Sequence, residues 1–205
     1  MRKSSIVFAA LACFFLHSSI YAAPVTFQFT GTVTQIVTDP ADPFGASIGF
    51  GTPVTGFFTF ESAAPDGAAD PLTGSYTSIG APFGLQMLIA GFAFLGNSSL
   101  NVGVGNDFGG TTDFYTLFAS GSSQISVTMM DPSGAVFADT SLPLTPPDIA
   151  AFLTRTFHLD TEVDGNIVQI DGTIDSLTME SQVPEPHTYV TISIAIGLGL
   201  LRRRK

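Results

Sequence analysis

The stretch from Asp160 to Asp171 carries the residue types and spacing of a cation-binding loop. It reads Asp-Thr-Glu-Val-Asp-Gly-Asn-Ile-Val-Gln-Ile-Asp, with carboxylates at its positions 1, 3, 5 and 12 and glycine at position 6. Oxygen ligands at alternate positions around a glycine turn are what a calcium loop requires. The candidate calcium ligands are Asp160, Glu162, Asp164 and Asp171.

An ordinary β-hairpin explains the same spacing. The last position is Asp where such loops have a bidentate Glu, and the flanks, residues 155–159 and those from Ile174 onward, read as strands instead of helices. The dipeptide Asp164-Gly165 between alternating segments is a strong hairpin signal. We therefore expect a hairpin with an acidic wet face and neither a metal nor another cofactor, and we keep the calcium site as the alternative.

Few other side chains could perform catalysis. The only cysteine, Cys13, lies near the N-terminus, and His158 is the only histidine between the two terminal segments. A lone His without a nearby Cys or second His cannot build a typical transition-metal site. No His-Glu-x-x-His motif occurs. General acid–base chemistry would fall to Asp, Glu or Tyr, so a carboxylate-pair glycoside hydrolase is an alternative to our expectation of no enzymatic activity.

The residues around these candidates indicate an all-β domain. Residues 25–37 alternate, with Val25, Phe27, Phe29, Val33 and Val37 on one face and Thr and Gln side chains on the other. A period of two over such a length predicts a half-buried strand. Clusters of Gly, Asn, Asp and Pro separate further apolar runs at 54–60, 85–94, 100–104, 114–118, 125–130, 156–163 and 166–179.

Two turn signals interrupt this pattern. Asp131-Pro132-Ser133-Gly134 predicts a turn, with a return strand at Val136 and Phe137. Pro146 and Pro147 predict the start of a short helix over 149–153. The predicted fold is an antiparallel β-sandwich or open barrel of roughly eight to ten short strands.

Since the chain has no Trp, a carbohydrate-binding surface would have to use Tyr76, Tyr115 or an exposed Phe such as Phe57.

The first 22 residues have the pattern of a secretory signal peptide. A basic start at Met1-Arg2-Lys3 precedes an apolar run over 6–16 and a small-residue stretch that ends in Ala22-Ala23. We expect signal peptidase to cleave between Ala22 and Ala23. Because Cys13 lies inside this peptide, the exported protein would contain no disulfide.

The last 23 residues combine a proline-containing segment, an apolar segment and a basic cluster, in that order. Val183-Pro184-Glu185-Pro186 precedes an uncharged run over 187–201, and Arg202-Arg203-Arg204-Lys205 ends the chain. As a helix, residues 188–201 would span about 21 Å, short of a hydrocarbon core of about 30 Å. The basic end is expected to stay cytoplasmic. The segment is therefore marginal as a permanent transmembrane helix and better suited to a temporary tether.

This order of features resembles the PEP-CTERM sorting signal of surface proteins in Gram-negative bacteria, and the resemblance covers only the tail. It implies that an exosortase, a membrane cysteine transpeptidase-like enzyme, recognises Pro184-Glu185-Pro186 and cuts near it. It also implies that Arg202, Arg203 and Arg204 hold the tail in register and that the protein is exported alongside exopolysaccharide. It implies nothing about what residues 23–182 do.

The charge of the remaining chain restricts its partners. Between Asp39 and Glu185 there are one basic residue, Arg155, and 17 acidic ones, a net charge of −16. Such an acidic body disfavours nucleic acid and anionic lipid surfaces as partners.

The sequence thus predicts three parts: a signal peptide (1–22), a secreted β domain (23–182) and a PEP-CTERM sorting and membrane tail (183–205). We expect an exported protein that is tethered to the membrane through its tail and then placed at the cell surface or in the extracellular matrix. Its expected role is structural or interactive. A calcium- or carbohydrate-binding module is the first alternative, and the carboxylate-pair hydrolase is the second.

Overall fold

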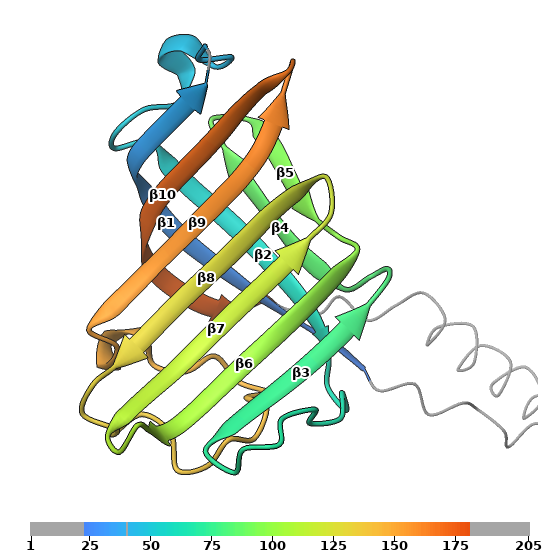
Figure 1. Cartoon of the computed structure of the whole chain (residues 1–205), viewed down its shortest axis with the longest axis vertical. Helices are drawn as coiled ribbons and strands as arrows, with labels where there is room; N and C mark the ends of the chain where they lie inside the picture. Colours follow the sequence, from blue (N-terminus) through green and yellow to red (C-terminus); the bar gives the residue numbers. More distant parts are fainter. Residues whose placement is uncertain (1–22, 40, 181–205) are drawn as a thin grey trace, which may run out of the picture.

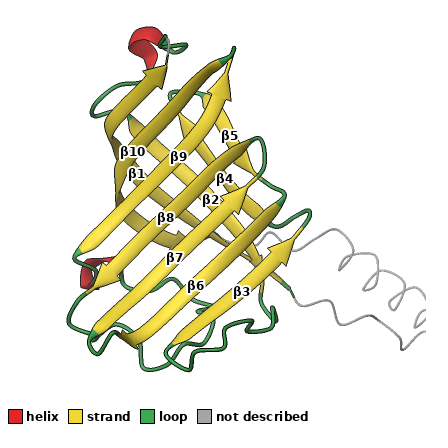
Figure 2. Ribbon diagram, viewed as in Figure 1, coloured by secondary structure: helices red, strands yellow, loops and turns green. Residues whose placement is uncertain are grey.

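Ten antiparallel strands form one continuous sheet in the computed structural model, which describes residues 23–39 and 41–180 (Figure 1). The strands are β1 (Pro24–Asp39), β2 (Pro53–Glu61), β3 (Thr73–Ile79), β4 (Gly84–Ile89), β5 (Phe92–Gly96), β6 (Ser99–Phe108), β7 (Thr112–Ser120), β8 (Ser123–Asp131), β9 (Thr154–Val163) and β10 (Asn166–Met179). Two single-turn 3-10 helices, η1 (Gly45–Ser47) and η2 (Ile149–Ala151), are the only helices in the described part of the chain (Figure 2).

The sheet curls back on itself into a half-barrel. Its strand order is β3-β6-β7-β8-β9-β10-β1-β2-β4-β5, so β3 and β5 are the two edges and do not pair with each other. In Figure 1, strands β3, β6, β7, β8 and β9 form the front layer, and β1, β2, β4 and β5 lie behind them. Across the interior β5 approaches β8 and β3 approaches β2. The predicted all-β antiparallel class is confirmed, β10 has the predicted bounds, and β1 is longer than the predicted run 25–37.

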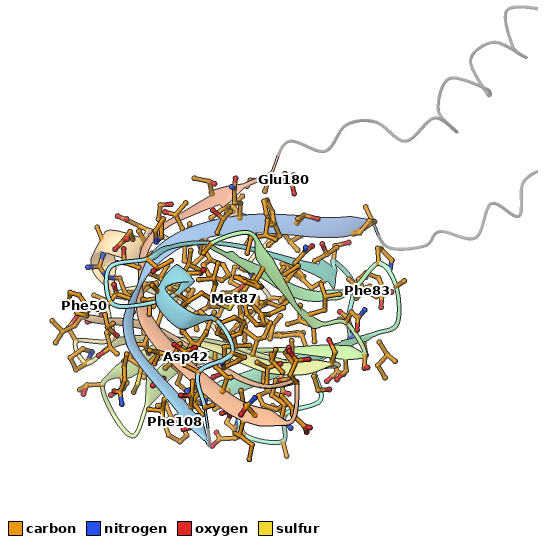
Figure 3. The ribbon with its side chains drawn as sticks, turned by 90° about the horizontal axis from the view of Figure 1, so that it is seen from above. Asp42, Phe50, Phe83, Met87, Phe108 and Glu180 are labelled. Carbon is orange, nitrogen blue, oxygen red and sulfur yellow. The ribbon has the colours of Figure 1, made fainter. Side chains whose placement is uncertain are left out.

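The core lies between the two layers. Most strands bury alternate residues, as in β2, where Val54, Phe58 and Phe60 point inward. Phe27 of β1 packs edge-on against Phe58 and Phe60, with 5.4 Å between the ring centroids in both pairs. Figure 3 shows the labelled Met87 within this interior, where it is fully buried. Burial of each large apolar side chain contributes roughly 1.5–3 kcal/mol.

Two irregularities change which residues of β1 face the core. The pairing of β1 with β10 shifts between Thr30 and Gly31 and again between Val33 and Gln35. Up to Val33 the predicted inward residues are buried or packed against the core, but Val37 is 44% exposed. The prediction for Val37 was wrong because an extra residue in one strand moves the following side chains to the opposite face.

Glycines opposite aromatic rings allow the curved sheet to close around its core. Gly56 pairs with Phe29, and Gly172 pairs with Phe157. A Cβ at either glycine would collide with the ring of its partner. The rings therefore occupy the space that a side chain on the neighbouring strand would need.

Three local predictions fail. Strand β3 lies in a segment for which no strand was predicted, and the run 85–94 forms the hairpin β4–β5 instead of one strand. The turn of that hairpin is made by Ala90 and Gly91, whose φ angles are 50° and 88°, the conformation that two-residue hairpin turns require. No strand forms at Val136 and Phe137, because a buried carboxylate binds their backbone N–H groups, as described below.

Candidate functional site

The β9–β10 hairpin brings together three of the polar residues singled out from the sequence. His158 of β9 pairs in register with Asp171 of β10, and Asp160 lies two residues along β9 on the same face. Asp171 Oδ1 lies 2.6 Å from His158 Nδ1, and Asp160 Oδ2 lies 2.8 Å from His158 Nε2. The imidazole is thus held between two carboxylates on the outer face of the sheet.

The charges of this cluster favour a protonated ring. Partial burial acts to lower the pKa of His158, but its hydrogen bonds to Asp171 and Asp160 and the charges of both carboxylates outweigh that effect. The pKa of His158 therefore lies above its ordinary value. Since all three side chains remain 38–40% exposed, solvent screens the interaction. The cluster can bind and release a proton, and it ties β9 to β10.

The hairpin predicted at Asp164-Gly165 is confirmed. Val163 pairs with Asn166, and the two turn residues have φ angles of 51° and 78°. Of the four candidate calcium ligands, Asp160 and Asp171 lie against His158, while Glu162 sits further along β9 and Asp164 lies in the turn. Within residues 23–39 and 41–180, no group of three metal-ligating side chains has a geometry suited to an ion. The calcium site stays a prediction, and the hairpin accounts for the spacing of its residues.

A second feature was not foreseen: the long connection between β8 and β9, which we call the strap (residues 132–153). It contains only the single turn η2 and crosses one end of the half-barrel (Figure 1). Connections of more than about 12–15 residues without secondary structure of their own are uncommon and are often functional.

A buried carboxylate from the sheet holds the start of the strap. The side chain of Asp113, at the beginning of β7, is fully buried. Its Oδ2 accepts the N–H groups of Val136 and Phe137 at 2.8 and 2.7 Å, and its Oδ1 accepts the N–H of Asp107 at 2.9 Å. These three hydrogen bonds offset the cost of burying a polar side chain.

Asp131, which pairs with Asp113 across β7 and β8, holds the turn into the strap. Its carboxylate accepts the hydroxyl and the N–H of Ser133 and the N–H of Ala135. The hydrogen bonds from Ser133 and from the N–H of Ala135 lower the pKa of Asp131. Both carboxylates therefore hold the first residues of the strap.

Aromatic residues fix the rest of the strap against the core. Phe137 stacks at a tilt on Tyr115 and on Phe152, with centroid distances of 6.4 and 6.0 Å. The hydroxyl of Tyr76 donates to the carbonyl of Thr140 at 2.8 Å. The hydroxyl of Tyr115 is buried and has no hydrogen-bond partner among the described residues, and burial raises the pKa of this phenol.

Burial removes two of the aromatic residues considered for sugar binding. Tyr76 is only 7% exposed and Tyr115 is fully buried, so neither can present a ring face to a sugar. That prediction was wrong for both tyrosines, because each lies at an inward position of its strand. Phe57 is partly buried, and the most exposed aromatic ring in the described residues is that of Phe50, which points outward in Figure 3.

Residues 135–151 of the strap line an open surface hollow of about 510 Å³. Its apolar lining includes Val136, Phe137, Leu142, Pro146 and Pro147. Two carboxylates, those of Asp139 and Asp148, and the residues Ser141 and Thr145 supply its polar lining. The volume lies in the range of small-molecule sites, which are mostly apolar with a few placed polar groups.

Two sequence features lie in the segment that forms this hollow, but each predicted only a local element of secondary structure. The prolines of the strap predicted a helix start and Asp131-Pro132-Ser133-Gly134 predicted a hairpin turn, whereas η2 begins after Asp148, whose side chain accepts the N–H of Ala150. The role of Asp113 has no local signal, since its strap partners lie 23 and 24 residues away.

The predicted sorting residues fall outside the described part of the chain. Val183, Pro184, Glu185, Pro186, Arg202, Arg203 and Arg204 lie beyond Glu180, and Ala22 lies before the exposed Ala23. Among the described residues, none of the helices has the length and apolar character needed to span a membrane.

The two ends of the described domain lie together. Phe27 pairs with Met179, and the N–H of Glu180 donates to the carbonyl of Thr26. Whatever precedes Ala23 and follows Glu180 is therefore attached to the same end of the half-barrel.

Comparison of the chain with protein-family models, with curated proteins and with solved structures gave no match in any of the three.

Proposed function

We propose that this protein is exported, tethered to the membrane through its C-terminal tail and released to the cell surface or extracellular matrix, where it has a structural or interaction role. The observation that carries the proposal is the order Pro184-Glu185-Pro186, apolar run, Arg202-Arg203-Arg204 at the end of the sequence. Signal peptidase and an exosortase are the processing partners that this order implies, and exopolysaccharide is the neighbouring polymer.

The geometry of the β domain supports a single point of attachment. Because β1 begins where β10 ends, a tail after Glu180 leaves from the end of the domain that also carries the strap. The other end carries the turn Asp164-Gly165 and the connection 41–52 with the exposed Phe50 (Figure 1). A domain tethered in this way would present that second end away from the membrane.

The carboxylates in the strap and beside it support a non-enzymatic role. A carboxylate-pair hydrolase needs one acid that is kept protonated and one that is ionised. Hydrogen bonds from the N–H and the hydroxyl of Ser141 lower the pKa of Asp139, which favours its ionised form. Asp113 and Asp131 are occupied by hydrogen bonds from the strap.

Intact-mass spectrometry of the protein recovered from its native cell envelope tests the proposal. We expect a mature chain that begins at Ala23 and ends near Pro186. In a variant in which Pro184, Glu185 and Pro186 are all replaced by Ala, the Arg202–Lys205 terminus should be retained. Thr191→Ser, a conservative change within the apolar run, is the matched control and should be processed normally. An exported wild-type protein that still carries Arg204-Lys205 would contradict the proposal.

A further inference from the structure

The hollow under the strap is built before any ligand arrives. Asp113 fixes Val136 and Phe137, and the hydroxyl of Tyr76 fixes Thr140. Pro146 and Pro147 restrict the backbone of the far wall, because proline locks its own φ angle and restricts its neighbour. Little conformational entropy then remains to be lost when a ligand binds, which favours affinity.

The lining of the hollow selects for one kind of charge. Neither Lys, Arg nor His is among the described residues that line it, whereas Asp139 and Asp148 are. The net charge of −16 between Asp39 and Glu185 raises the local concentration of cations further. Anionic ligands are therefore disfavoured both by the hollow and by the protein around it.

The lining also separates organic cations from simple ions. Asp139 and Asp148 each use one oxygen to accept an N–H of their own turn, from Ser141 and Ala150 respectively, and apolar walls that include Val136, Phe137 and Leu142 belong to the same lining. A hydrated metal ion would leave those walls in contact with water. A protonated amine on an apolar body satisfies both parts, since its ammonium group can reach a carboxylate while its body covers Val136, Phe137 and Leu142.

We propose that the hollow under the strap is a binding site for a small organic amine, with the ammonium group at Asp139 and Asp148 and an apolar body against the aromatic and proline-rich walls. The phenyl ring of Phe137 adds a surface to which cations are attracted. This inference does not depend on the sorting tail and survives if the tail is processed differently.

Titration calorimetry and saturation-transfer NMR on the full chain in mild detergent, with three probes of one shape, test the site. Benzylamine should bind in the millimolar range, benzyl alcohol about fivefold more weakly or worse, and benzoate not at all. Two further probes separate sources of the amine: Nα-acetyl-lysine amide carries it on an apolar stem, and glucosamine carries it on a polar ring. The apolar walls predict that the lysine derivative binds more tightly.

Variants locate the binding. Asp139→Asn combined with Asp148→Asn keeps the oxygen acceptors that hold the two turns and removes both charges, so benzylamine affinity should fall about fivefold or more. Asp70→Asn is the matched control: Asp70 accepts the N–H of Leu72 two residues on, as Asp139 accepts that of Ser141, and it lies outside the hollow. Ala151→Leu places a larger side chain at an exposed lining position and should weaken binding with both charges in place.

The proposal is overturned if benzylamine does not bind, if benzoate or benzyl alcohol binds as well, or if the double Asn variant keeps wild-type affinity. It is also overturned if Asp70→Asn weakens binding as much as the double variant, because the effect would then come from net charge alone. Tighter binding of glucosamine than of the lysine derivative would refute the assignment of an apolar body.

Discussion

The strap and the β9–β10 hairpin both depend on aspartates, but they use them in opposite environments. Beside the strap, the buried Asp113 of β7 and Asp131 of β8 accept N–H groups of its backbone and determine where this long irregular segment runs. In the hairpin, the half-exposed Asp160 and Asp171 contact one imidazole on a surface that the strand pairing already determines.

The difference shows that burial, more than the number of polar contacts, sets what an interaction contributes. An unsatisfied buried polar group costs about 1–3 kcal/mol, so each bond to Asp113 matters to the strap. A half-exposed ion pair typically contributes about 0–1 kcal/mol, because water replaces the lost partner. The strap should therefore be sensitive to single substitutions, and the hairpin should tolerate them.

The largest effect is expected at Asp113. Asp113→Ala would leave the N–H groups of Asp107, Val136 and Phe137 without their acceptor and should lower the free energy of unfolding by about 3 kcal/mol or more. Asp175→Ala, which removes an exposed carboxylate bonded to the hydroxyl of Thr32, should change it by less than about 1 kcal/mol. Urea denaturation followed by circular dichroism measures both. Equal losses in the two variants would remove the distinction between buried and exposed carboxylates.

The two buried tyrosines near the strap should respond in opposite directions to loss of the hydroxyl. Tyr115→Phe removes a buried hydroxyl that has no partner and should stabilise the protein by about 1 kcal/mol. Tyr76→Phe breaks the hydrogen bond to the carbonyl of Thr140 and should destabilise it by a similar amount. Thermal melts of both variants give the comparison. A destabilised Tyr115→Phe variant would mean that the hydroxyl has a favourable contact in solution.

At acid pH the turn into the strap should weaken. Because the pKa of Asp131 is lowered from 3.8 in the folded state, its contribution is present above that unfolded value and is lost as the pH falls through the folded one. The stability difference between wild type and Asp131→Asn should therefore be larger at about pH 6 than at about pH 2. Asp70→Asn, measured in parallel, corrects for the change in net charge. A difference that does not depend on pH would argue against an ionised Asp131 in the turn.

The smallest effect is expected at His158, and its pH dependence has the opposite sign. Its folded pKa is raised above 6.5, so its contribution is fully present below that unfolded value and is lost as the pH rises through the folded one. Since the ring is 39% exposed, the difference between wild type and His158→Gln should stay below about 1 kcal/mol at about pH 6 and vanish at about pH 9. NMR titration of the imidazole checks the direction of the shift. A His158 pKa at or below 6.5 would show that the carboxylates do not outweigh burial.

Local patterns predicted those parts of the fold that depend on neighbouring residues. The strand over 54–60, the alternation in the first part of β1 and the hairpin at Asp164-Gly165 are correct. The same patterns failed wherever a distant group intervened. Val37 faces outward because of a shift in pairing with β10. Val136 and Phe137 form no strand because the carboxylate of Asp113 binds their backbone N–H groups.

The candidate sites divide in the same way. His158, Asp160 and Asp171 were all noted from the sequence, but their meeting depends on the register that places residue 158 opposite residue 171. The hollow under the strap could not be predicted, because its walls are positioned by Asp113 of β7 and Tyr76 of β3. No pattern in residues 132–153 identifies either of those partners.

The sequence by itself determined the all-β class, the acidic charge of the body and the order of basic, apolar and proline-containing stretches at the two ends. These features follow from composition, periodicity and order along the chain. Only the tertiary structure decided that the ends of the domain lie side by side, that His158 lies between two carboxylates and that the strap forms an open hollow. Each of these arrangements depends on contacts between residues far apart in the chain, and the pairing of strands across the sheet, including the two shifts between β1 and β10, determines which residues meet.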